Sequence, residues 1–223
     1  MIAPATFDFL VRKGALHETR VAPAIAPAAV DLAPGQVVAA VDAFAFTANN
    51  VTYAVFGDAM QYWDFYPAPD GWGRIPVWGF AEVLRSRCAE IEPGERLFGY
   101  WPMSTWAVLS PAEVTAGGFH DATPHRQHLH ALYNAYTRGA GDPGYDPQRE
   151  APQMLLRVLF LTAFLIDDFL ADQDFFGATS VVIASASSKT ALSLAHCLHA
   201  NRRGRVAVVG LTSPAHVAFC QGL

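Results

Sequence analysis

The sequence predicts an α/β plus β protein with a β-rich first part and a partial doubly wound parallel sheet in its last part. Three observations carry this expectation. Short apolar runs separated by Gly and Pro turns fill residues 1–120. One long apolar helical pattern covers residues 151–173. Residues 181–211 then follow the order of strand, small-residue turn, helix and strand.

The first part, residues 1–120, is expected to form a small barrel or sandwich, because its apolar runs recur at strand spacing. Turn residues such as Gly35 and the pair Pro93–Gly94 separate these runs. The expected strands lie within five segments, residues 7–13, 33–47, 75–86, 88–102 and 105–114.

Residues 121–150 are expected to form a linker with one short helix over 125–138, since this polar stretch is rich in His, Gly and Pro. The next element should be a long helix over 151–173, where Pro152 suits the first helical turn. These boundaries make residues 151–223 the start of a nucleotide-binding type of domain.

The last part begins with a buried strand at 181–184, passes through the turn SASSKTA at 185–191 and reaches a second strand at 205–211. Because a helical crossover joins parallel strands, we expect residues 181–184 and 206–209 to pair in parallel. Two strands leave such a sheet incomplete. The expectation is either an N-terminal fragment of a longer protein or a short chain that pairs with another copy as a homo-oligomer.

Composition excludes several classes of protein. A net charge of −5 and a pI near 5.9 disfavour a nucleic-acid partner. The most apolar run, residues 154–170, is interrupted by Arg157, Asp167 and Asp168, so no membrane span is expected. The N-terminus lacks the apolar core of a signal peptide, and the three cysteines are scattered. A cytoplasmic protein is therefore expected.

The turn after the first nucleotide-type strand is the candidate cofactor site. Backbone amides and hydroxyls at a helix N-terminus bind a pyrophosphate, and a lysine there adds positive charge. Hydroxyls at the end of the second strand, with no Asp or Glu beside them, favour NADP(H) over NAD. The alternative is a degenerate turn in which the hydroxyls only cap helices. The candidate cofactor-binding residues are Ser185, Ser187, Ser188, Lys189, Thr190, Gly210, Thr212 and Ser213.

The order of β-rich part, long helix and βαβ unit resembles the medium-chain dehydrogenase/reductase superfamily, in its zinc-free quinone and enoyl reductase branch. The strings that carry this resemblance are PGQVVAAVDAFAFTANNVTY, IPVWGFAEVLRS, EPGERLFGYWPMSTWAVLSPAEV and LFLTAFLIDDFL. The stretch TANNVTYAVFGDAMQYWDFYP together with SASSKTAL is most similar to a bacterial family of unknown function within that superfamily. The resemblance leaves out residues 119–152, and it implies a GroES-like β-barrel followed by a Rossmann-type domain.

The same resemblance points to a substrate loop at TANNVTYAVFGD, residues 47–58. Asn50 is expected to hydrogen-bond a substrate carbonyl, and Tyr53 or Tyr62 to donate a proton as hydride arrives. Quinone reductases carry an Asp where this chain has Tyr53. The alternative is that Asn49–Asn50 forms a turn and the tyrosines fill the barrel core.

Zinc is not expected, because the loop lacks a Cys, no His follows Gly79 and no H-E-x-x-H motif occurs. The expected function is NADP(H)-dependent reduction of a carbonyl or an activated double bond in a small-molecule substrate. The alternative is a non-catalytic binding module that kept the fold and lost the cofactor turn.

Overall fold

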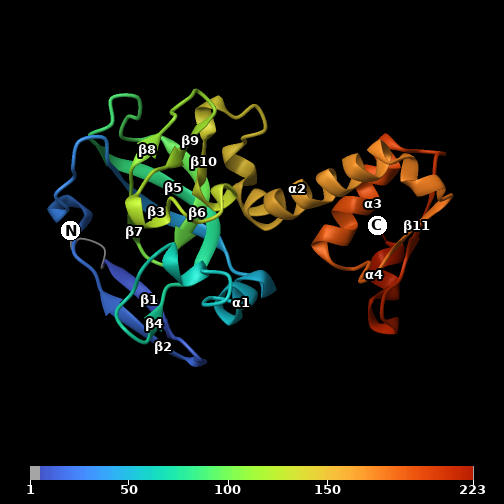
Figure 1. The fold of residues 1–223 in the computed structure, drawn as a ribbon, viewed down its shortest axis with the longest axis horizontal. Coiled ribbons are helices and arrows are strands. Elements are labelled where there is room, and N and C mark those ends of the chain that lie inside the picture. The colour runs from blue at the N-terminus through green and yellow to red at the C-terminus, as the bar shows by residue number, and fades with distance from the viewer. Residues whose placement is uncertain (1–5, 223) are drawn as a thin grey trace. The chain divides into compact units, whose positions relative to one another are not determined.

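The computed structural model describes residues 6–222, and the chain divides into two compact units, Met1–Met154 and Leu155–Leu223 (Figure 1). The first unit contains helix α1 (Ala48–Val55) and ten strands among the described residues. The strands are β1 (Phe7–Arg12), β2 (Ala15–Pro23), β3 (Val37–Ala45), β4 (Trp72–Gly73), β5 (Pro76–Ser86), β6 (Arg96–Pro102), β7 (Trp106–Leu109), β8 (Pro111–Ala112), β9 (Gly118–Asp121) and β10 (Ala135–Arg138).

Seven of these strands form one antiparallel sheet in the order β7-β3-β5-β6-β10-β9-β8. Strand β5 lies inside this sheet and pairs with β3 on one side and with β6 on the other. A smaller sheet with the order β2-β1-β4 completes the unit. All five predicted strand segments contain strands of the structure, so the β-rich first part is confirmed.

The core of the first unit is aromatic and fully enclosed. Strand β6 is buried from Leu97 to Pro102, and both Tyr100 and Trp101 have no exposed surface. The Trp101 indole Nε1 donates to the Gly79 carbonyl oxygen at 3.1 Å, so its polar atom is satisfied inside the core. Burying such large side chains supplies much of the free energy that holds the barrel together.

The prediction of one short helix within residues 121–150 is wrong. Instead of a helix over 125–138, 3₁₀ turns occur at Pro124–Arg126 and Ala131–Asn134. They are followed by strand β10, which pairs with β6 and β9. The helical periodicity of this segment is weak, and pairing with a sheet satisfies more backbone groups than a short isolated helix. This segment therefore belongs to the first compact unit.

Helix α1 replaces the loop that we expected at residues 47–58. Its first residue follows Thr47, and the Thr47 amide donates to the Asn50 Oδ1 atom at 2.7 Å. This contact satisfies a backbone donor at the N-terminus of α1 that would otherwise lack a partner. The Asn-Asn pair, which suggests a turn in the sequence, is here the start of a helix.

The second unit has a two-stranded parallel sheet of β11 (Ser180–Ile183) and β12 (Ala207–Gly210), joined through helix α3 (Lys189–Asn201). The parallel pairing predicted from the βαβ pattern is confirmed. Helix α2 (Glu150–Asp172) matches the predicted long helix, and α4 (Val217–Gln221) follows β12. The buried Asp167 of α2 accepts hydrogen bonds from Asn201 and Arg202 at the C-terminal end of α3.

An ion-pair cluster on the first unit predicts a pH effect on stability. Hydrogen bonds from Arg96 hold the pKa of the Glu150 carboxyl below its ordinary value of 4.5. A lowered carboxyl pKa stabilises the fold fully above pH 4.5, and the stabilisation is lost as the pH falls further. We expect Glu150→Gln to remove this part of the acid dependence, measured as unfolding free energy against pH. Glu92→Gln, at an exposed position, is the control and should leave the profile unchanged.

Candidate functional site

The turn between β11 and α3 brings several predicted cofactor residues to one helix N-terminus. Ser185 adopts the left-handed conformation with φ of 51°, and its carbonyl oxygen accepts from the Ser188 amide at 2.8 Å. The Ser188 hydroxyl caps α3 by accepting from the Ala191 amide at 3.3 Å. The amides of Lys189 and Thr190, the first two residues of α3, have no intrahelical acceptor and are available to an anion.

The end of β12 lies against this turn. The Ala186 amide donates to the Leu211 carbonyl oxygen at 2.9 Å, and the Thr212 hydroxyl donates to the Ser187 hydroxyl at 3.5 Å. A Cβ atom on Gly210 would lie 2.9 Å from the Ala186 Cβ, so glycine permits this close approach.

These contacts fit a dinucleotide phosphate in part. Two free amides, the Lys189 charge and the Ser187–Thr212 pair lie at one end of the unit, which suits an anionic group. Ser213 is already engaged, because its hydroxyl lies 2.9 Å from Nδ1 of His216. The turn contains no glycine, and its one left-handed residue is Ser185, which is a strained choice for a side-chain-bearing residue.

In the first unit, two of the three predicted catalytic residues meet in an aromatic cluster. The ring centroids of Tyr53 and Tyr62 are 4.8 Å apart, and both side chains are nearly buried. Tyr133 joins them, with its hydroxyl 3.3 Å from that of Tyr62. Tyr100 packs 4.7 Å from Tyr133, and the Trp78 indole donates to the Tyr53 hydroxyl at 3.3 Å.

Burial determines the ionisation of these phenols. It raises the pKa of Tyr53 and of Tyr133 above the ordinary value of 10.0. The pKa of Tyr100 is raised for the same reason. All three hydroxyls therefore stay protonated and can donate hydrogen bonds throughout the neutral range.

Asn50, the third predicted catalytic residue, uses its amide for structure. Its Nδ2 donates to the Pro76 carbonyl oxygen at 3.0 Å, and its Oδ1 accepts from the amide of Thr47. The side chain is 3% exposed. Asn50 thus anchors α1 to β5, and the structure does not place its amide among the tyrosine hydroxyls.

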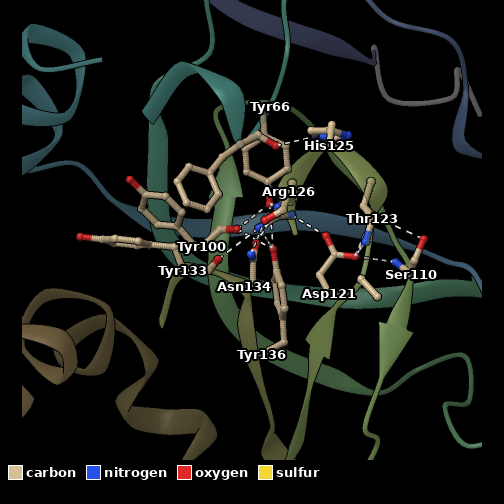
Figure 2. Close-up of polar contacts among 12 residues, drawn as sticks. Tyr66, Tyr100, Ser110, Asp121, Thr123, His125, Arg126, Tyr133, Asn134 and Tyr136 are labelled. Carbon is tan, nitrogen blue, oxygen red and sulfur yellow. Dashed lines mark hydrogen bonds and ion pairs between the residues drawn. The ribbon is translucent and has the colours of Figure 1, made fainter. Parts of the chain in front are cut away.

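A buried charged network lies beside the tyrosines (Figure 2). Arg126 is 1% exposed and pairs with the fully buried Asp121, its Nη1 donating to Oδ2 at 2.7 Å. The other guanidinium N–H groups donate to Tyr66 Oη, Asn134 Oδ1, Tyr133 O and Tyr136 Oη. With five donors and five acceptors, the guanidinium is saturated.

The network orients the tyrosine cluster. In Figure 2 the rings of Tyr100 and Tyr133 extend side by side away from Arg126, while their backbone faces the network. The Tyr100 carbonyl oxygen accepts from the hydroxyls of Tyr66 and Tyr136 at 2.5 and 2.8 Å. Burial disfavours the charge of Arg126, but its interactions with Tyr136, Tyr66 and Asp121 outweigh burial and raise its pKa. The guanidinium therefore stays charged.

Sequence reasoning missed Tyr100, Arg126 and Tyr133 as parts of this site. Tyr100 lies in a predicted strand, but the sequence pattern did not indicate that its side chain contacts Tyr53 of the expected loop. Arg126 and Tyr133 lie in the segment that we expected to be a linker. The available signal was an arginine with Asp121 five positions before it and Tyr133 and Tyr136 after it, since a charged residue near apolar segments is buried when it is paired.

Two further findings concern metals and membranes. Residues 6–222 contain no group of three or more His, Cys, Asp or Glu side chains placed to hold a metal ion. The same residues include no helix that is long and apolar enough to cross a membrane.

The two architectures define the fold of the protein. An antiparallel barrel of GroES-like type, followed along the chain by a Rossmann-type parallel βαβ unit, is also the fold of solved enoyl reductases, so the fold implied by the resemblance drawn from sequence is confirmed. The chain belongs to the family described as "Protein of unknown function (DUF2855)", whose model matches residues 44–223. No curated protein matches the chain in sequence.

Solved structures share this fold at low sequence identity. The CurK enoyl reductase has a TM-score of 0.56 and 12% identity, and the match covers 98% of this chain and 57% of the reductase chain. The Coxiella burnetii quinone oxidoreductase has a TM-score of 0.50 and 12% identity, covering 97% and 59%. The mitochondrial 2-enoyl thioester reductase Etr1p/Etr2p heterodimer from Candida tropicalis has a TM-score of 0.50 and 13% identity, covering 100% and 59%. The chain thus spans under three fifths of the length of these structures.

Proposed function

We propose that this chain forms part of an NADP(H)-dependent oxidoreductase that reduces a carbonyl or an activated double bond of a small-molecule substrate. The observation that carries the proposal is the N-terminus of α3, where the amides of Lys189 and Thr190 lack intrahelical acceptors. The Ser187–Thr212 hydroxyl pair lies at the same end of the second unit. Bound NADPH would supply the hydride.

The chain's own residues would hold the dinucleotide by its phosphates. The α3 amides and the helix dipole favour an anion, and Lys189 adds a partly screened charge. The segment from Gly210 to Ser213 carries hydroxyls and no acid, so it offers no carboxylate to the ribose hydroxyls that NAD enzymes bind. This composition supports a preference for the 2′-phosphate of NADP(H).

In the first unit, the tyrosine hydroxyls would act on the substrate. They are hydroxyl donors in an aromatic setting, and such a donor stabilises the negative charge that develops on a carbonyl oxygen as hydride arrives. Tyr53 and Tyr62 are the candidates from sequence, and Tyr133 joins them because its hydroxyl pairs with that of Tyr62. Asn50 would support them by fixing helix α1.

The second candidate is a binding module without catalysis. The turn without glycine, with Ser185 in the left-handed conformation, favours it, because dinucleotide turns need close backbone approach. Fluorescence titration of NADPH and NADH against the purified protein distinguishes the two. Tighter binding of NADPH than of NADH supports the reductase. Equal affinity for the two nucleotides would contradict a preference for the 2′-phosphate. Failure to bind either nucleotide supports the binding module.

Lys189→Ala tests the phosphate contact. We expect it to weaken NADPH binding by about 1 kcal/mol, or roughly fivefold in Kd, because the exposed ammonium is screened by solvent. Arg203→Ala is the matched control, since Arg203 is an exposed cation beyond the other end of α3. An equal loss in both variants would mean that net charge, and not the turn, attracts the nucleotide.

A further inference from the structure

The first unit contains a cavity of about 390 Å³ between two chain segments, residues 60–65 and 129–133. We propose that this cavity binds the planar ring of an aromatic carbonyl compound, whose oxygen accepts a hydrogen bond from the Tyr62–Tyr133 hydroxyl pair. The proposal rests on the proposed function only in taking this ligand to be the substrate. The volume of the cavity lies within the range of small-molecule sites.

The walls of the cavity favour a flat ring. Phe65, Tyr62 and Tyr133 line it, and their rings meet edge to face at centroid distances of 5.5 to 5.7 Å. Leucine and methionine side chains complete the apolar surface. Aromatic faces and edges bind another ring in stacked or edge-to-face geometry, which an extended acyl chain cannot match.

The polar groups of the cavity favour a neutral acceptor oxygen. No Asp, Glu, Lys or Arg is among its lining residues, so no carboxylate, ammonium or guanidinium group there pairs with a charged ligand. Within the Tyr62–Tyr133 pair one hydroxyl donates to the other, and the second hydroxyl hydrogen remains free to donate. His130 Nδ1 accepts from the Leu132 amide at 3.2 Å, so the neutral ring carries its proton on Nε2 and is a second donor.

A buried hydroxyl in the same cluster lacks a partner. Tyr100 is fully buried, and no described residue hydrogen-bonds its hydroxyl. Its ring packs 4.7 Å from Tyr133 and 5.4 Å from Phe65, both of which line the cavity. An unpaired buried O–H is destabilising, so the Tyr100 hydroxyl needs a partner that the described residues do not supply. The cluster therefore carries more donors than the protein itself uses.

The wall formed by residues 129–133 is held rigidly by the buried network. Arg126 donates to the Tyr133 carbonyl oxygen at 3.1 Å and to the side chain of Asn134 at 2.9 Å. The Asn134 amide returns a hydrogen bond to the Arg126 carbonyl oxygen. These hydrogen bonds hold the backbone of Tyr133 in place before a ligand binds. Little conformational entropy is then lost on binding, which favours recognition of a single oxygen atom.

The test compares two ligands of nearly the same shape, 2-acetylnaphthalene and 2-isopropenylnaphthalene, titrated against the full chain without nucleotide. The ketone should bind roughly tenfold more tightly, the effect of one hydrogen bond in a desolvated site. The extended enone 3-nonen-2-one should bind more weakly than 2-acetylnaphthalene. Equal binding of the two naphthalenes, or tighter binding of the enone, would overturn the proposal.

Tyrosine variants locate the effect. Tyr62→Phe and Tyr133→Phe keep the rings, and we expect each to reduce the preference for the ketone and the double variant to abolish it. Tyr145→Phe, whose hydroxyl donates to Glu150 outside the cavity, should keep the full preference. A full preference in the double variant, with unchanged thermal unfolding, would refute the role of the pair.

The result is separable from the proposed function. Ketone preference in a protein that binds neither NADPH nor NADH supports the cavity and removes the reductase. NADPH binding without ketone preference supports the reductase and overturns the cavity proposal.

Discussion

Arg126→Met is expected to lower the unfolding free energy of the first unit by about 3–5 kcal/mol. The substitution leaves Asp121 charged, fully buried and without its cation, while four further acceptors of the guanidinium lose a donor. Leaving one partner of a buried ion pair behind destabilises far more than the pair itself stabilises. Urea denaturation followed by tryptophan fluorescence reports on this unit, because all five tryptophans lie before residue 155.

The double variant Arg126→Met with Asp121→Asn is the informative control. Removing both charges should recover part of the loss, since no unpaired carboxylate then remains. The side-chain amide oxygen that Asp121→Asn introduces can still accept from the Ser110 and Thr123 amides that now bond the carboxylate. A single variant that loses less than about 1 kcal/mol would place Arg126 in a solvated setting and contradict the network.

Trp101→Ala should destabilise the same unit by about 3–5 kcal/mol. Trp101 has no exposed surface and packs 4.9 Å from the Tyr136 ring, so truncation leaves a cavity in the centre of the barrel and removes the side-chain donor to the Gly79 carbonyl. Circular dichroism during urea denaturation measures the change without depending on the lost indole.

Trp106→Ala is the matched comparison for this prediction. Trp106 is partly exposed at the edge strand β7 and donates to the Ile25 carbonyl oxygen at 2.9 Å. Its removal should lower the unfolding free energy by about 1 kcal/mol, the contribution of one accessible hydrogen bond. Equal losses in the two variants would contradict the assignment of Trp101 to the core.

The sequence carried enough information for the elements whose burial pattern is periodic. The strand at Pro76–Ser86, the helix at Glu150–Asp172 and the parallel pair β11–β12 all followed from apolar runs bounded by turn residues. Local chemistry decides such elements, because apolar spacing sets which face is buried. The superfamily fold followed from their order along the chain.

Residues whose roles depend on distant partners could not be assigned in this way. Tyr133 meets Tyr62 from 71 positions away, and Arg126 meets Tyr66 from 60 positions away. The family resemblance predicts a substrate contact for Asn50, whereas its side-chain amide already donates to the carbonyl oxygen of Pro76. Whether a polar side chain is free or engaged is a tertiary property, and no local spacing encodes it.

The fixed backbone of residues 129–133 has a consequence for protein engineering. The network holds this wall through the main chain and through Asn134, while the side chains of Met60 and Leu132, 57% and 40% exposed, lie at the rim and take no part in it. Substitution of these two rim side chains therefore removes no hydrogen bond of the network. We expect variation at the rim positions to change the shape of the cavity mouth while the hydrogen bonds beneath it stay intact.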